Sequence, residues 1–202
     1  MNIKIIIYFF LAVIVLSSCK KTNDELFDEA YNLTKRKEYD KAIKVYTELI
    51  KRNRKLQLPY YNRGYCYYSK EDYSRALFDF NTVMELQTVG GFILTFNPNL
   101  PFAGEEAKYQ VPYYDALYQR AQVNFYLEKD SASFEDFNML IANNYVEKSN
   151  CYLWQGNIVL NNGDTAKACS YFLNSQKFAN SELINQEAQK MLTKYCSLNN
   201  SR

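Results

Sequence analysis

The feature that most constrains the fold of this chain is a spacing of 34 residues between matching side chains. The interval relates three pairs: Tyr39 and Tyr73, Ala42 and Ala76, and Tyr46 and Phe80. Apolar residues at positions 42, 45, 46, 49 and 50 follow the spacing of one buried helix face. A helical repeat of this length is a hairpin of two helices. Such hairpins stack on one another, because none can bury its apolar face alone.

The repeat continues along most of the chain. The motifs Arg63-Gly64 and Asp79-Phe80-Asn81 return as Arg120-Ala121 and Asp136-Phe137-Asn138, each 57 residues later. That interval exceeds one repeat, so an insertion separates the second and third units. Phe137 and Phe172, 35 residues apart, relate the third unit to the fourth. The sequence thus predicts an all-α solenoid with four hairpins at about 25–55, 58–87, 113–146 and 149–180, a non-helical insertion at 88–112 and a capping helix at 181–198.

Small residues stand where the two helices of a hairpin must approach closely: Ala42, Gly64 and Ala76. With an aromatic residue before the second helix, and Ala followed four positions later by another aromatic, they resemble the tetratricopeptide repeat. The resemblance covers residues 24–198 outside the insertion. It is weakest in the third unit, where Asn124 and Ser133 stand in place of the usual Tyr and Ala. We therefore expect that unit to be distorted or less stable.

The resemblance also implies where a partner sits, since the first helix of each hairpin lines the concave face in this family. The matching positions are mostly aromatic or amide: Phe27, Tyr31, Tyr61, Tyr65, Tyr68, Tyr118, Gln122, Phe125, Tyr126, Asn157 and Asn161. Tyrosine combines a large contact area with a hydroxyl for hydrogen bonding, which suits an extended peptide. For each single residue, packing between hairpins is an equally good interpretation.

The insertion at 88–112 is rich in helix-breaking residues. It contains Gly90-Gly91 and, with Pro112, three prolines. The run from Phe92 to Phe96 has strand propensity. Two interpretations stay open: the segment folds over the groove and completes the core, or it presents a contact surface to a partner or the membrane.

The N-terminus has the pattern of a secretion signal. Lys4 precedes an apolar run of about 12 residues, Ile5 to Leu16, which is too short to cross a bilayer as a helix. The following Leu16-Ser17-Ser18-Cys19 resembles the lipobox of bacterial lipoproteins, which implies a signal peptide at 1–18, lipidation of Cys19 and a tether at 19–24. An ordinary cleaved signal and an uncleaved anchor are the alternatives. We expect a lipid anchor in the outer membrane, facing the periplasm.

Composition excludes several functions. The chain has no histidine, which removes the commonest general base and the usual zinc ligand. No phosphate-binding loop or Cys-x-x-Cys pair is present, so we expect no cofactor, no metal and no catalytic residue. Carboxylate pairs such as Asp79 with Asp136, or Glu105 with Glu106, are expected to be solvated. A net charge of +2, with basic residues spread along the helices, argues against nucleic acid.

Four cysteines remain besides Cys19. Cys169 falls early in the second helix of the fourth unit, and Cys196 falls late in the antiparallel helix that follows, so both lie at one level. A disulfide between them is the favoured pairing in an oxidising periplasm. Cys66 and Cys151 belong to units separated by a whole hairpin and are expected to be reduced and buried.

These features together predict a non-catalytic scaffold in the cell envelope that binds a protein or peptide on its concave face. The alternative is a small molecule or glycan held between the insertion and the tyrosine-rich face. A catalytic role using carboxylates alone would require two of them to face each other across a cleft. The identity of the partner and the oligomeric state stay open.

Overall fold

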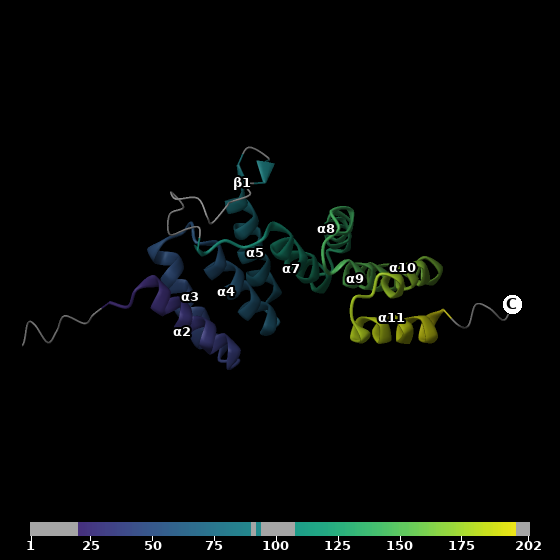
Figure 1. Cartoon of the computed structure of the whole chain (residues 1–202), viewed down its shortest axis with the longest axis horizontal. Coiled ribbons are helices and arrows are strands. Elements are labelled where there is room, and N and C mark those ends of the chain that lie inside the picture. Colours follow the sequence, from purple (N-terminus) through teal and green to yellow (C-terminus); the bar gives the residue numbers. More distant parts are fainter. Residues whose placement is uncertain (1–19, 90–91, 94–107, 197–202) are drawn as a thin grey trace, which may run out of the picture.

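Amphipathic segments form nine helices among residues 20–89, 92–93 and 108–196, the part of the chain that the computed structural model describes (Figure 1). Consecutive helices pack against each other along the chain, so that the array is an all-α solenoid with elongated form. The helices are α2 (Asn23–Lys35), α3 (Tyr39–Arg52), α4 (Gln57–Ser69), α5 (Tyr73–Gln87), α7 (Tyr113–Tyr126), α8 (Asp130–Ala142), α9 (Lys148–Asn161), α10 (Thr165–Lys177) and α11 (Glu182–Tyr195). The four predicted hairpins are α2–α3, α4–α5, α7–α8 and α9–α10, and α11 packs on α10.

The same turn joins the two helices of every hairpin. Its central residue has a left-handed backbone, at Lys37, Glu71, Glu128 and Gly163. In each turn the N–H of the next residue donates to the carbonyl five residues back, as from Glu38 to Leu33. This hydrogen bond satisfies a carbonyl at the end of the first helix. Only the fourth unit uses glycine here, which explains why the sequence gives no obvious turn signal in the other three.

Small residues keep the helices of each hairpin close. A Cβ atom added at Gly156 would lie 2.3 Å from Cε1 of Phe172, and one at Gly64 would lie 3.0 Å from Cε1 of Phe80. Ala121 has the same place in the third unit and is fully buried. The aromatic ring of each second helix therefore packs directly against the backbone of the first.

The third unit is regular, and the distortion expected there is not found. Ser133 is fully buried, and its hydroxyl donates to the carbonyl of Ala121 at 2.8 Å. Asn124 is also buried, and its side-chain amide donates to Asp136 at 3.4 Å. The polar substitutions are tolerated because each finds a hydrogen-bond partner inside the hairpin.

A buried arginine–aspartate pair lies inside the second hairpin, and its arginine also reaches the first hairpin. Arg63 of α4 donates two hydrogen bonds to Asp79 of α5, at 2.9 and 2.7 Å, and a third to Thr47 of α3 at 3.0 Å. Burial raises the pKa of Asp79, and the Arg63 guanidinium opposes that shift. One side chain thus ties the second hairpin together and attaches it to the first.

The same link recurs at both later junctions. Arg120 of α7 bonds Asp136 of α8 at 2.9 and 2.6 Å and lies 3.5 Å from the Asn81 amide oxygen on α5. In the fourth unit Gln155 takes the place of the arginine and donates to Asn138 of α8 at 2.7 Å. We expected Asp79 and Asp136 to be solvated, and this is wrong: they are 0% and 5% exposed. Glu105 and Glu106 lie outside the described residues.

The described part of the insertion begins with a short antiparallel pair, β1 (Thr88–Val89) and β2 (Phe92–Ile93). It ends in residues 108–111, which we call the strap. Here the carbonyl of Tyr109 accepts the N–H of Leu58 at 2.7 Å, which satisfies a free N–H at the start of α4. The N–H of Val111 donates to Gln57 at 3.1 Å. The strap therefore fastens the end of the insertion to the second hairpin.

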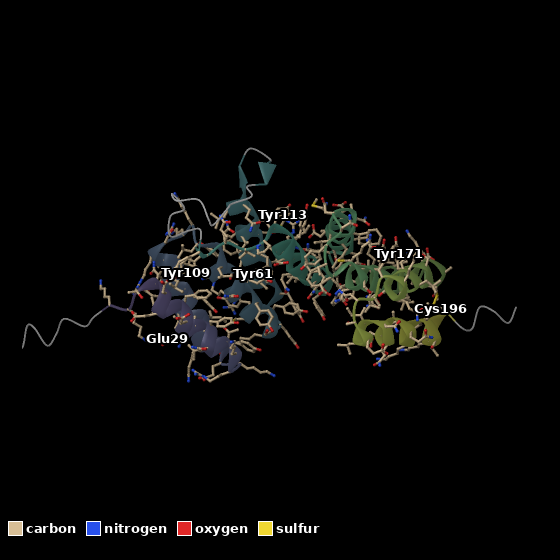
Figure 2. The ribbon with its side chains drawn as sticks, viewed as in Figure 1. Glu29, Tyr61, Tyr109, Tyr113, Tyr171 and Cys196 are labelled. Atoms are coloured by element: carbon tan, nitrogen blue, oxygen red, sulfur yellow. A yellow bond between two sulfur atoms is a disulfide. The ribbon has the colours of Figure 1, made fainter. Side chains whose placement is uncertain are left out.

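A disulfide closes the C-terminal end. Cys169 and Cys196 are bonded, the pair that the sequence indicated, and they tie α10 to the end of α11 (Figure 2). The bridge closes a loop of 27 residues, which on the chain-entropy relation stabilises the capping helix by about 3.5 kcal/mol. Cys66 and Cys151 are free thiols and buried, as expected.

Replacing Arg63 tests its ion pair with Asp79 inside the second hairpin. Arg63→Met leaves the Asp79 carboxylate buried without its partner, so we expect the free energy of unfolding to fall by about 3–5 kcal/mol. Adding Asp79→Leu removes the stranded charge and should recover most of the loss. Urea unfolding followed by circular dichroism measures both. A single variant as stable as the parent, or a double variant as unstable as the single one, would contradict a structural role for the pair.

Candidate peptide-binding face

The first helices of the hairpins, α2, α4, α7 and α9, share one face, which we call the inner face. Its middle is an aromatic cluster. The Tyr126 ring stacks on Tyr73 at 4.8 Å between centroids and contacts Tyr68 at 5.8 Å and Trp154 at 5.9 Å. Phe125 contacts Trp154 at 5.1 Å. The cluster joins α4, α5, α7 and α9, so it spans three units.

Three tyrosines on this face remain substantially accessible. Tyr31 of α2, Tyr65 of α4 and Tyr126 of α7 are 43%, 42% and 42% exposed. Tyr31 and Tyr65 lie 34 residues apart and hold the same place in successive repeats. The Tyr126 ring packs against the aromatic cluster on one side. The exposed fraction of each of the three rings is available for contact with a partner.

Other predicted contact residues are packed against neighbouring side chains, largely within their own hairpin, and not left open to a partner. The Tyr61 ring meets Phe80 at 5.7 Å, and Tyr118 lies 6.1 Å from Phe137 and 5.6 Å from Tyr145. Burial raises the pKa of Tyr61 and of Tyr118 to about 12. The amide of Gln122 is 9% exposed. These three side chains support the face and offer little surface to a ligand.

The strap covers the N-terminal part of the inner face. Tyr109 is 3% exposed, its ring meets Phe27 at 5.4 Å, and its hydroxyl donates to Asp24 at 2.6 Å (Figure 2). The Lys108 ammonium bonds the other oxygen of Asp24 at 2.6 Å and holds the pKa of that carboxyl below its usual value. A chain segment of the protein therefore already occupies the surface beside Phe27.

A small pocket lies beside the strap. It has a volume of about 300 Å³ and is lined by Asp24, Phe27, Asp28, Leu58, Lys108 and Tyr109. This is the described part of the site that the sequence predicted between the insertion and the aromatic face. The volume is at the lower limit of ligand-binding pockets, and its carboxylate and ammonium already pair with each other.

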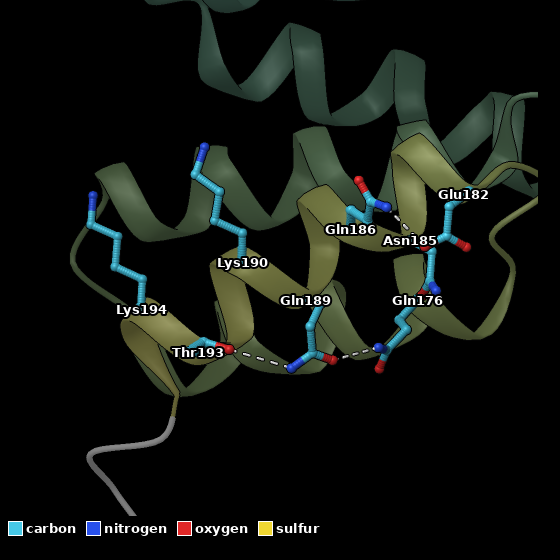
Figure 3. A pocket seen from close by; sticks show the side chains of 8 residues that line it. All are labelled: Gln176, Glu182, Asn185, Gln186, Gln189, Lys190, Thr193 and Lys194. Atoms are coloured by element: carbon cyan, nitrogen blue, oxygen red, sulfur yellow. Dashed lines mark hydrogen bonds between the residues drawn. The ribbon is translucent and has the colours of Figure 1, made fainter.

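The C-terminal part of the face is polar. Asn157 of α9 is partly buried and Asn161 is exposed. A surface pocket of about 590 Å³ follows α11, where Gln176, Gln189 and Thr193 form a hydrogen-bonded row (Figure 3). All eight side chains that line it end in polar or charged groups. None of the eight is an aromatic or aliphatic residue of the kind that lines most small-ligand pockets.

Sequence reasoning missed three residues of this region: Tyr73, Tyr109 and Trp154. Tyr73 and Tyr109 lie outside the first helices, so the positions implied by the repeat do not include them. Trp154 lies three residues before Asn157, the first predicted contact residue of its helix, and its ring packs at the junction between the third and fourth units. Its ring is stacked 6.2 Å from Phe137. Trp154 is the single tryptophan of the chain, and this was the sequence signal that could have identified it.

The described residues show no arrangement for redox or metal chemistry. No group of three or more Cys, Asp or Glu side chains there could hold a metal ion. Burial raises the pKa of the Cys151 thiol to about 12 and raises that of Cys66, so neither is a ready nucleophile. None of the helices within the described ranges is long and apolar enough to span a membrane. Cys19 and the predicted signal lie outside those ranges.

Comparisons with known proteins agree with this geometry. Residues 59–88 match the sequence profile of the tetratricopeptide repeat. The fold is a tetratricopeptide-repeat solenoid. A double mutant of MamA RS-1 superimposes with a TM-score of 0.64 at 13% identity, covering 88% of this chain and 87% of that one. MamA 41-end from Desulfovibrio magneticus RS-1 gives 0.61 at 15% identity, with coverages of 89% and 96%.

A third tetratricopeptide structure is YrrB, described as "a TPR protein with an unusual peptide-binding site". It gives a TM-score of 0.57 at 16% identity and covers 94% of this chain and 93% of that one. A search of curated proteins gives no significant match. At these identities the likeness is one of fold.

Alkaline titration tests which tyrosines are buried. An unfolded tyrosine ionises near pH 10, whereas Tyr61 and Tyr118 ionise at about 12 in the folded chain. The unfolded chain loses these protons first, so their contribution to stability is complete below about pH 10 and disappears as the pH rises to about 12. We expect a tyrosinate absorbance component near pH 12, or at the alkaline unfolding transition if that comes first.

The double variant Tyr61→Phe, Tyr118→Phe should reduce that late component and leave the earlier part of the titration curve unchanged. A late component of undiminished size would show that these two rings do not have the buried environment described here.

Proposed function

We propose that the protein is a non-catalytic scaffold that binds an extended segment of a partner protein along its inner face. The observation that carries this proposal is the exposure of Tyr31, Tyr65 and Tyr126 on three successive first helices. Rigid, half-exposed tyrosines give contact area at little cost in conformational entropy. The peptide-binding site for which YrrB is described supports the same use of this fold.

Charge pairing argues against a catalytic role for the buried carboxylates. Asp79 and Asp136 are each bonded through both carboxylate oxygens to an arginine of their own hairpin. With no histidine in the chain, the inner face offers tyrosine and amide groups, which suit recognition. We therefore assign the protein a binding function and no reaction.

Small-molecule binding is the second candidate, and the pocket beside the strap is the observation that favours it. Its six lining residues combine one aromatic ring of α2, the Tyr109 ring and charged groups. The peptide proposal is stronger because Asp24, Lys108 and Tyr109 of this pocket already bond one another, whereas the exposed tyrosines are open.

The compartment that we propose is the cell envelope, with Cys19 acylated and the solenoid held at the outer membrane on its periplasmic side. The N-terminal sequence pattern supports this, as does the Cys169–Cys196 disulfide, since such bonds persist in oxidising compartments. A partner would then be another protein of the envelope.

Site-specific photocrosslinking tests the inner face. A photoreactive residue at position 65 or 126 should capture the same partner, whereas one at Phe78 or Leu173, which are 65% and 55% exposed on second helices, should not. The triple variant Tyr31→Ser, Tyr65→Ser, Tyr126→Ser should weaken binding of that partner at least about tenfold, or 1.4 kcal/mol. The matched control Phe78→Ser, Leu173→Ser should bind normally. Equal loss in both variants would argue against an inner-face site.

Lipid labelling tests the anchor independently of any partner. Cells supplied with a clickable palmitate should label the protein, because an acylated Cys19 carries fatty acid. Cys19→Ala should abolish the label, and Cys66→Ala, which changes a buried thiol, should retain it. Undiminished labelling of Cys19→Ala would place any acylation elsewhere.

A further inference from the structure

A dense group of cations lies where the described chain begins. Residues 51–55 read Lys-Arg-Asn-Arg-Lys, and residues 20 and 21 are both lysine. The two segments are far apart in sequence but touch in the fold, because α3 runs antiparallel to α2 and ends beside its start. Arg52 donates a hydrogen bond to the carbonyl of Lys21 at 2.6 Å. We call these six residues, Lys20, Lys21, Lys51, Arg52, Arg54 and Lys55, the basic edge.

Most of this charge is not neutralised by the fold. Lys21 pairs with Glu29 at 2.9 Å, and Arg52 pairs with Glu48 at 3.3 Å. Within the described ranges, no ion pair involves the side chains of the other four, and all four residues are exposed. We expected the basic residues to be spread out along the helices, and at this edge that is wrong.

The loop that carries the cations is held in a defined conformation. The side-chain oxygen of Asn53 accepts the N–H of Lys55 at 3.0 Å, which fixes the turn between α3 and α4. Leu56 and Gln57, directly after the loop, are buried. The cations thus project from a fixed turn beside the tether.

We propose that the basic edge binds the anionic headgroups of the membrane in which the chain is anchored. Charge complementarity and position support this: the 51–55 loop, whose Lys51, Arg54 and Lys55 have no ion pair to described residues, contacts Lys21 through Arg52, and the apolar run Ile5–Leu16 precedes these lysines in sequence. A single lipid chain gives only marginal attachment, and a polybasic patch is a common second signal.

The contact would also orient the solenoid. The basic edge lies at the α2–α3 end of the array, and α11 lies toward the other end (Figure 1). Headgroup binding at the basic edge therefore places the α2–α3 hairpin at the membrane and leaves the exposed tyrosines of later units for a partner. This orientation rests on the proposed anchor, but binding of headgroups by the cations does not.

Lysine footprinting on vesicles tests the proposal with the full chain. The protein is reconstituted into phosphatidylcholine vesicles, with or without about one third phosphatidylglycerol, and acetylated briefly with an amine-reactive ester. Anionic vesicles should slow acetylation of Lys51 and Lys55 at least about threefold, and high salt should remove the effect, because surface charge is screened. Lys190 and Lys194 of α11 are exposed internal controls and should react equally in both vesicles.

A variant and a soluble anion sharpen the result. Lys51→Gln, Arg54→Gln, Lys55→Gln keeps Arg52 and its bond to Lys21. In the parent chain we expect anionic vesicles also to slow acetylation of Lys20, and this variant should lose that slowing. The matched variant Lys190→Gln, Lys194→Gln should keep it. Equal reactivity of Lys51 and Lys55 in both vesicles would overturn the proposal. Slowing by inorganic phosphate with neutral vesicles would also overturn it, by showing a site for a free anion. Palmitate labelling of Cys19 reports on the anchor separately.

Discussion

The solenoid depends on one polar side chain at each junction between hairpins. Arg63, Arg120 and Gln155 hold the same place in three successive first helices, and each reaches back to the preceding unit. The arginines also bond an aspartate of their own hairpin, and where the fourth unit has Tyr171 in place of that aspartate, the neutral glutamine replaces the arginine. Matching charge to partner in this way gives the buried Asp79 and Asp136 a compensating charge.

Those links set the geometry of the inner face. Successive first helices are held in register, so Tyr31 and Tyr65 repeat at one level, and the aromatic cluster around Tyr126 bridges the next junction. The face is thereby divided into three parts. The strap covers the part beside Phe27, exposed tyrosines occupy the middle, and amides dominate near α11. A bound segment would meet aromatic rings first and hydrogen-bonding groups toward the capping helix.

The sequence predicted the hairpins well because their signals are local. Small residues, aromatic rings and helical spacing identify each unit, and Cys169 with Cys196 follows from antiparallel helices. The failures concern contacts between distant segments. Asp79 and Asp136 look like surface carboxylates until the arginine 16 residues earlier is seen to face each one across its hairpin. Nothing in the residues around Lys108 and Tyr109 indicates Asp24 as their partner. Likewise, the sequence does not distinguish Tyr61 from Tyr65, although in the structure Tyr61 packs against Phe80 and Tyr65 is exposed.

The strap at one end of the array and the Cys169–Cys196 disulfide at the other affect how the array unfolds. A linear stack held only by neighbours frays from its terminal units. Here the strap joins Asp24 to a segment 84 residues away, and the disulfide locks α11 to α10, so neither terminal unit can peel off alone. Opening would then begin at an internal junction. The joint between α8 and α9 is where we expect the molecule to hinge, because these two helices make the least contact of any described neighbouring pair and a neutral glutamine stands there in place of the arginine of the other two junctions.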